Sequence, residues 1–215
     1  MRYLWLHGFA SGPTSSKGRF VQERLWERGV ELAIPDLNAP AFFGLTVTRM
    51  LGQIDELAGQ EELVLLGSSL GGFTAATWAA TRPGRVRALV LLAPAFDLGP
   101  RWTRRMAPAE VEAWRKTGRI SVEHYAWGRM EDLSYEFLID ACRYETFPLP
   151  RCPTLVIHGA QDDVVDPALS REFVRRMEGR AQLLELDQGH ELNADLPALW
   201  RQIEAFLEAQ GLPTP

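Results

Sequence analysis

Cysteine and long apolar runs are scarce in this sequence, and each shortage excludes a class of protein. The only cysteines are Cys142 and Cys152. Without a secretory leader, two cysteines predict reduced thiols rather than a disulfide framework. The apolar stretch at the N-terminus is too short for a signal peptide, and no later run approaches the roughly 18 apolar residues of a membrane span. We therefore expect a cytoplasmic protein without a membrane partner.

Charge of one sign is not concentrated anywhere along the chain. The 23 basic and 28 acidic residues give a formal net charge of −5, and the basic residues are scattered among the acids. Nucleic-acid binding needs a basic stripe, so we expect no nucleic-acid partner. With 215 residues, 46% of them hydrophobic, the chain fits one soluble domain, residues 1–215, with a buried core. The oligomeric state stays open.

Short apolar runs alternate with amphipathic stretches along most of the chain. The runs are rich in Leu, Val and Ile, as expected of strands buried on both faces of a sheet. They predict six strands: Tyr3–Leu6, Val30–Ile34, Leu63–Leu66, Val86–Leu92, Thr154–Ile157 and Gln182–Leu186. The stretches between them predict five helices: Ser15–Arg28, Leu45–Ala58, Leu70–Thr81, Pro167–Met177 and Asp195–Glu208. This alternation is typical of an α/β fold with a doubly wound, mostly parallel sheet.

One connection, at about residues 97–148, is far longer than a crossover between parallel strands requires. It has about fifty residues where a dozen suffice, and it carries more large apolar side chains than a solvated loop would. Ligands of open α/β sheets bind at the carboxyl edge of the strands, so we interpret the insertion as a helical lid over that edge. Its candidate substrate contacts are Trp102, Trp127 and Tyr135. The alternative is an insertion that extends the core and touches no ligand.

A G-x-S-x-G pattern, Gly67-Ser68-Ser69-Leu70-Gly71, lies between a predicted strand and a predicted helix. The string alone arises by chance in about one chain of this length in fifteen, so its strand–turn–helix context carries the interpretation. That context predicts a sharp turn that exposes the Ser69 hydroxyl as a nucleophile, with clearance from the two glycines. Ser68 has the same chemistry at the wrong position, so we expect it to form a local hydrogen bond.

Two backbone N–H groups are the candidate donors of an oxyanion hole. The N–H of Leu70 begins the helix after Ser69 and points toward the oxygen of a tetrahedral intermediate. The second donor comes from the loop after the first strand, where Phe9 is the candidate. His7 precedes the nucleophile in the chain, so we interpret it as a structural residue that forms hydrogen bonds within this loop.

Asp162 follows the fifth predicted strand and His190 follows the sixth, which places both at the sheet edge that carries Ser69. The chain order Ser, Asp, His is that of hydrolases with a nucleophile elbow. His190 would accept the serine proton, and the Asp162 carboxylate would orient the imidazole and stabilise the imidazolium. The alternatives for the acid are Asp97, Asp163 and Asp166.

Metal and nucleotide chemistry have no support in the sequence. The four histidines and two cysteines lack any short ligand spacing, and no nucleotide-binding fingerprint is present. We therefore expect no metal and no cofactor. His124 is interpreted as a lid residue, and His158 as a residue that packs a loop.

Both halves of the chain resemble known enzymes. The opening, with LHGFASGP at residues 6–13 and SSKG at 15–18, resembles small bacterial esterases of the α/β-hydrolase superfamily. The lid and C-terminal half, with His158-Gly159 and Gly189-His190, are similar to acyl-protein thioesterase and acyl-glucuronide esterase relatives. The resemblance covers nearly the whole chain and implies a serine hydrolase whose triad is Ser69, Asp162 and His190. Asp166 departs from it, because such relatives often have proline after the Val-Val pair.

Taken together, these residues and the resemblance predict a small-molecule substrate, an ester or thioester with an apolar acyl or aryl group. The acyl group would pass to Ser69 and then to water activated by His190. Two alternatives stay open. One is a C–C bond hydrolase or peptidase that uses the same triad, and the other is a non-catalytic module that binds a small ligand.

Overall fold

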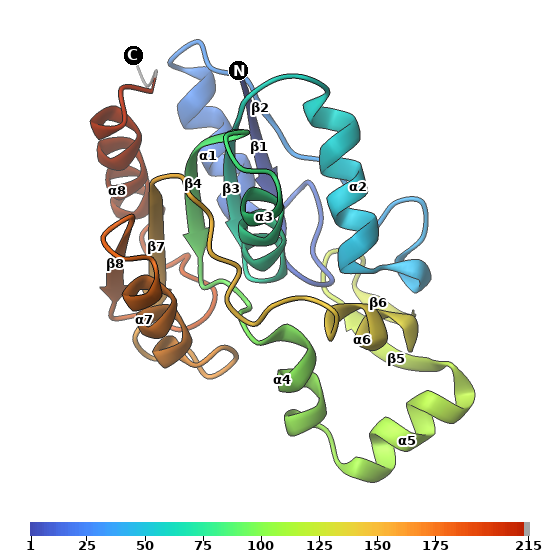
Figure 1. Ribbon diagram of the computed structural model, residues 1–215. Helices are drawn as coiled ribbons and strands as arrows, with labels where there is room; N and C mark the ends of the chain where they lie inside the picture. The colour runs from blue at the N-terminus through green and yellow to red at the C-terminus, as the bar shows by residue number, and fades with distance from the viewer. Residues whose placement is uncertain (213–215) are drawn as a thin grey trace.

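The computed structural model describes residues 1–212, so the last three residues of the predicted domain, 213–215, lie outside the described part. Six parallel strands form one sheet in the order β2-β1-β3-β4-β7-β8. The chain starts at β1, moves to the edge at β2, and then crosses back to β3 and on toward β8 (Figure 1). The sheet is therefore doubly wound, as predicted.

All six predicted strands are present: β1 (Arg2–Leu6), β2 (Leu32–Ala33), β3 (Leu63–Ser68), β4 (Val86–Leu92), β7 (Thr154–Gly159) and β8 (Ala181–Leu186). Every residue of β3 and β7 is buried, which explains the continuous apolar runs of these strands. β2 is shorter than the predicted Val30–Ile34, because this edge strand pairs with β1 at two positions only.

Helices cover both faces of the sheet (Figure 1). One face packs against α1 (Ser16–Trp26) and α8 (Leu196–Ala209), and the other against α2 (Val47–Ala58), α3 (Leu70–Thr81) and α7 (Pro167–Arg176). All five predicted helices are therefore confirmed. Asp195 caps α8 by accepting a hydrogen bond from the N–H of Ala198, whereas Ser15 makes no side-chain bond at the start of α1.

The insertion between β4 and β7 lies beyond the carboxyl ends of the strands, below the sheet in Figure 1. It contains α4 (Leu98–Arg105), α5 (Pro108–Thr117) and α6 (Glu136–Ala141), together with an antiparallel hairpin of β5 (Arg119–His124) and β6 (Arg129–Ser134). The prediction of a helical lid therefore missed the hairpin. Inward-facing Ile120, Val122 and His124 alternate with exposed residues along β5, and this period of two is the signal that indicated a strand.

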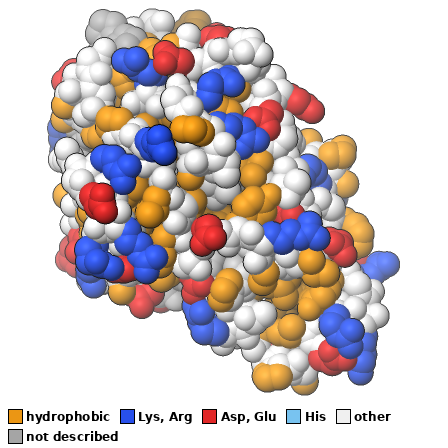
Figure 2. Space-filling view, in the orientation of Figure 1, with side chains coloured by type: hydrophobic (Ala, Val, Ile, Leu, Met, Phe, Trp, Pro, Cys, Tyr) orange, Lys and Arg blue, Asp and Glu red, His pale blue; other side chains and the backbone are white. Residues whose placement is uncertain are grey.

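The surface mixes charges of both signs. On the face seen in Figure 2, basic and acidic side chains are interspersed over the body of the protein, and apolar side chains gather on the insertion. Within residues 1–212, no helix combines the length and the apolar character needed to cross a bilayer.

Both cysteines carry free thiols, in agreement with the sequence prediction. Cys142 is exposed and Cys152 is buried. Burial raises the pKa of the Cys152 thiol to about 11, so this residue holds little thiolate at neutral pH. Cys152 is accordingly a packing residue of the core.

Candidate active site

Ser69 occupies a sharp turn between the end of β3 and the start of α3. Its φ of 53° and ψ of −115° lie in a region that residues with side chains rarely adopt, so the turn is strained. Hydrogen bonds hold this conformation: the N–H of Ser69 donates to Leu92 at 2.8 Å, and its carbonyl accepts from Phe73 and Ala95, each at 3.0 Å. The turn places Ser69 in the wall of a pocket.

Glycines on either side of Ser69 allow the turn to pack closely. A Cβ on Gly67 would lie 2.5 Å from the carbonyl oxygen of Gly71, and a Cβ on Gly71 would lie 2.1 Å from that of Leu6. Both distances are far below van der Waals contact. The two positions must therefore be glycine for β1, β3 and α3 to meet behind the serine.

Three side chains from three loops form one chain of hydrogen bonds. Nε2 of His190 lies 3.1 Å from Oγ of Ser69, and Nδ1 of His190 lies 2.7 Å from Oδ2 of Asp162. His190 follows β8 and Asp162 follows β7, so the parallel sheet brings both to the edge where β3 ends. Because an ionised carboxylate only accepts, Nδ1 carries the proton and Nε2 is the acceptor for the serine hydroxyl.

The Asp162 carboxylate is buried and accepts hydrogen bonds on both oxygens. Oδ1 accepts from the N–H groups of Val164 and Val165, each at 2.8 Å. Oδ2 accepts from His190 and, at 3.0 Å, from Nε2 of His158. Burial by itself raises the pKa of Asp162, but the bonds from the two histidines and from Val165 outweigh it and lower that pKa below its usual value. Asp162 is therefore ionised at neutral pH.

This lowered pKa predicts how the stability of the fold depends on pH. A carboxyl group whose pKa is lower in the folded state stabilises the fold above the unfolded-state pKa, about 3.9 for aspartate, and loses that effect as pH falls below it. We expect the difference in unfolding free energy between wild type and Asp162→Asn to shrink as pH falls from 5 to 3. Urea denaturation at several pH values measures it, and a constant or growing difference would contradict the assignment.

His158 belongs to the site in a way that sequence reasoning missed. It is fully buried in β7, and its Nε2 donates to Asp162 and, at 3.1 Å, to the carbonyl of Val165. Its Nδ1 accepts from the hydroxyl of Ser170 at 2.7 Å. His158 and His190 thus hold the same carboxylate oxygen, Oδ2 of Asp162. The only signal in the sequence was its position four residues before Asp162.

The alternative acids have other partners or surroundings. Asp97 forms an ion pair with Arg104, Asp166 accepts from the N–H of Ala168 at the start of α7, and Asp163 is exposed. The carboxylate that meets the histidine is therefore that of the predicted residue. Within residues 1–212, no group of three or more His, Cys, Asp or Glu side chains is placed to hold a metal ion.

The loop after β1 lies against Ser69. A Cβ on Gly8 would lie 3.5 Å from the Cβ of Ser69, and the next residue, Phe9, lines the pocket. His7 is buried and holds this loop, because its Nδ1–H donates to the carbonyl of Gly8 at 2.9 Å and its Nε2 accepts from the N–H of Leu37 at 3.0 Å. Burial lowers the pKa of His7, which favours this neutral form. This is the structural role predicted for His7.

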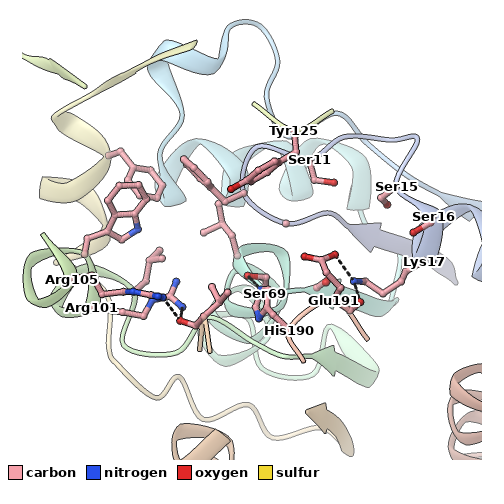
Figure 3. Close-up of a pocket in the computed structure, with 18 of the residues that line it drawn as sticks. Ser11, Ser15, Ser16, Lys17, Ser69, Arg101, Arg105, Tyr125, His190 and Glu191 are labelled. Carbon is pink, nitrogen blue, oxygen red and sulfur yellow. Dashed lines mark hydrogen bonds and ion pairs between the residues drawn. The ribbon is translucent and has the colours of Figure 1, made fainter. Parts of the chain in front are cut away.

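A pocket of about 670 Å³ opens beside Ser69 (Figure 3). Its apolar lining comes from both sides of the nucleophile and from the insertion: Phe9, Leu70, Leu98, Trp102, Met106 and Phe137. Ring centroids of Phe9 lie 5.4 Å from Trp102 and 5.7 Å from Phe137, so these rings form one continuous surface. The insertion therefore reaches the pocket rather than only extending the core.

The predicted lid contacts need one correction. Trp102 lines the pocket, but Trp127 and Tyr135 do not. Trp127 stacks on His124 with ring centroids 3.8 Å apart, and Tyr135 packs edge-on against a tryptophan of α5. Trp127 also packs against the ring of Phe42, outside the insertion. The unpredicted hairpin therefore directs Trp127 to these contacts and not to the pocket. Tyr125, in the turn of that hairpin, lines the pocket instead.

A family model described as Uncharacterised protein family (UPF0227) matches residues 2–208. Among curated proteins, the mitochondrial palmitoyl-protein thioesterase ABHD10 of Homo sapiens is 31% identical over 133 residues. These residues are 60% of this chain and 43% of the human protein. The match thus spans less than half of that relative's length.

Solved structures share the architecture over nearly the whole chain. Alpha/beta hydrolase domain-containing protein 10 from mouse superposes with a TM-score of 0.80 at 21% identity, covering 96% of this chain and 89% of the other. Est1E from Butyrivibrio proteoclasticus with bound ferulic acid superposes with a TM-score of 0.80 at 21% identity, covering 97% of this chain and 88% of the other. At these identities the likeness concerns the fold. It confirms the predicted α/β-hydrolase fold.

Proposed function

We propose that this chain, which belongs to the Uncharacterised protein family (UPF0227), hydrolyses carboxylic esters or thioesters through an acyl-enzyme on Ser69. The observation that carries the proposal is the chain of hydrogen bonds from Ser69 through His190 to Asp162 in the wall of a largely apolar pocket. The name of the human relative, a palmitoyl-protein thioesterase, supports the same class of reaction.

The proposed reaction has two steps that use the same proton path. Oγ of Ser69 attacks the acyl carbonyl carbon while its proton moves to Nε2 of His190. The imidazolium, stabilised by Asp162 through Nδ1–H, then gives the proton to the departing alcohol or thiol and leaves the acyl group esterified to Ser69. In the second step His190 takes a proton from water, which attacks the carbonyl carbon of the acyl-enzyme. The imidazolium then returns the proton to Oγ of Ser69 as the bond from Oγ to the acyl group breaks, which releases the carboxylic acid and restores the free serine.

The negative oxygen of each tetrahedral intermediate needs hydrogen-bond donors, and we assign the N–H groups of Leu70 and Phe9 to this role. Leu70 is the first residue of α3, and N–H groups in the first turn of a helix have no acceptor within the helix. Phe9 follows Gly8 in the loop that lies against Ser69. Both residues line the pocket. Two preorganised donors at this point would stabilise the transition state.

Replacing the nucleophile tests the proposal. Wild type and Ser69→Ala are compared on p-nitrophenyl esters from acetate to palmitate and on the matching acyl-CoA thioesters. We expect kcat to fall by about 10³-fold or more in Ser69→Ala, because the acyl-enzyme can no longer form. The preferred acyl chain length would indicate how long a chain the apolar part of the pocket accommodates. The ratio of ester to thioester rates would identify the preferred leaving group.

Ser68→Ala is the matched control, because it removes the neighbouring hydroxyl at the buried end of β3. A fluorophosphonate should label wild type and Ser68→Ala covalently but not Ser69→Ala. Hydrolysis that survives Ser69→Ala would refute the proposal. Labelling of Ser69 without hydrolysis of any ester or thioester would favour a C–C bond hydrolase or peptidase, and neither labelling nor hydrolysis would favour a ligand-binding module.

A further inference from the structure

Positive charge prevails around the pocket, although the whole chain carries a net charge of −5. The lysine, arginine and carboxylate side chains that line it are Lys17, Arg101, Arg105 and Glu191. Nζ of Lys17 lies 3.6 Å from the Glu191 carboxylate, so these two neutralise each other. The two arginines are left as the uncompensated charge of the pocket lining.

Arg101 and Arg105 form hydrogen bonds with backbone carbonyls instead of carboxylates. They lie four residues apart in α4 and therefore on one face of the helix. Arg101 donates to the carbonyl of Val164 at 3.4 Å, and Arg105 donates to the same carbonyl at 2.6 Å and to that of Asp163 at 3.1 Å. Of the ion pairs found within residues 1–212, none includes either arginine, whereas Arg104 between them pairs with an aspartate.

Two guanidinium groups that share one carbonyl repel each other. Burial, together with the charge of Arg105, lowers the pKa of Arg101 to about 10. The carboxylates of Asp162 and Asp97 act in the opposite direction, but histidines and Arg104 already occupy them. Each guanidinium has five N–H donors, and the carbonyls use only one or two. A bound anion would supply the negative charge that these arginines lack, and it would accept hydrogen bonds from their remaining N–H groups.

The pair lines the same pocket as Ser69 and His190. Figure 3 shows Arg101 and Arg105 on one side of Ser69, with Lys17 and Glu191 on the other. A molecule held by the arginines therefore shares the cavity with the nucleophile. Building on the proposed function, we propose that Arg101 and Arg105 bind an anionic group of the substrate, a carboxylate or a phosphate, on the side of the scissile bond that faces α4.

Matched substrates measure this preference. On the acyl side, the p-nitrophenyl half-ester of glutaric acid is compared with p-nitrophenyl valerate, in which a methyl group replaces the carboxylate. On the alcohol side, the butyrate ester of 4-hydroxybenzoate is compared with that of 4-hydroxybenzamide. The readout is the ratio of kcat/KM for the charged ester to that for the neutral one, which is independent of the concentration of active enzyme.

We expect Arg101→Gln and Arg105→Gln each to lower this ratio by on the order of 10- to 100-fold for one of the two pairs, because each removes a charge-assisted hydrogen bond. The pair affected tells whether the anion is on the acyl or the alcohol side. Arg115 is an exposed arginine of α5 that pairs with Glu112 on the same helix and does not line the pocket, so Arg115→Gln should leave the ratio unchanged. An equal fall of the ratio in Arg115→Gln, or no fall in either pocket variant, would overturn the proposal.

A binding measurement separates this proposal from the proposed function. Glutarate and inorganic phosphate should raise the melting temperature of the wild type above its value in chloride at the same ionic strength, and the more effective anion identifies the group. Arg101→Gln and Arg105→Gln should lose this increase, while Arg115→Gln should keep it. If the wild type hydrolyses no ester, the proposed function fails and the melting data alone decide on the anion site. No increase with either anion would refute the site.

Discussion

We expect Asp162→Asn to lower kcat for a p-nitrophenyl ester by about 10⁴-fold, the size of effect known when a triad acid becomes an amide. Two backbone N–H groups, of Val164 and Val165, donate to Oδ1, so that position must remain an oxygen. The amide nitrogen then takes the place of Oδ2, where it meets Nδ1 of His190 at 2.7 Å. An N–H donor there forces the proton of the imidazole onto Nε2, which can no longer accept from Ser69.

Asp163→Asn is the control for this variant. It makes the same chemical change at the adjacent residue, whose side chain is exposed, so we expect nearly wild-type kcat. Steady-state kinetics measures kcat of both variants. Urea denaturation shows that each variant is folded at the assay pH. A large loss in Asp163→Asn together with a small one in Asp162→Asn would show that the wrong acid was assigned.

A single methyl group on Gly71 should have the largest effect on stability. The Cβ of Gly71→Ala would lie 2.1 Å from the carbonyl oxygen of Leu6 and 2.6 Å from that of His7. Both contacts are with backbone, so relief requires β1 and α3 to move apart. We expect a loss of about 3 kcal/mol or more in unfolding free energy, or a protein that does not fold. Urea denaturation measures the loss of unfolding free energy, and the soluble fraction after expression shows whether the variant folds.

Gly52→Ala makes the same substitution where space is open. Gly52 lies inside α2, and a Cβ built there has no neighbour within 4 Å. Because alanine favours helix over glycine, we expect this variant to gain about 0.5–1 kcal/mol. If unfolding free energy falls in Gly71→Ala and rises in Gly52→Ala, the clash behind Ser69 destabilises the fold, and not the general effect of replacing a glycine. Wild-type stability in Gly71→Ala would contradict the packing described.

The positions of Ser69, Asp162 and His190 could be predicted because each follows a strand of a parallel sheet. Strand positions are visible in the chain as apolar runs, and parallel strands all end at one edge, so three residues far apart in sequence were expected together. The structure places them within hydrogen-bond distance. Their catalytic roles stay predictions until the variants are measured.

The lid was less predictable, because its residues face neighbours that the local sequence does not reveal. Trp102 lines the pocket and Trp127 does not, although both are tryptophans of the same insertion. The difference arises from the hairpin, which stacks Trp127 on His124 and leaves Tyr125 at the pocket. The inward direction of Arg101 depends in the same way on where α4 meets the loop that contains Val164.

The sequence by itself determined the α/β architecture, the strained turn at Ser69 and the order of the triad residues, because periodicity and glycine spacing are local properties of a chain. Only the tertiary structure distinguished Asp162 from the adjacent Asp163, since the two are chemically identical and differ in burial and in the donors that surround them. It alone joined His158 to the site and Arg101 to the pocket. Such contacts depend on the direction of each side chain, which is set by packing against residues distant in sequence.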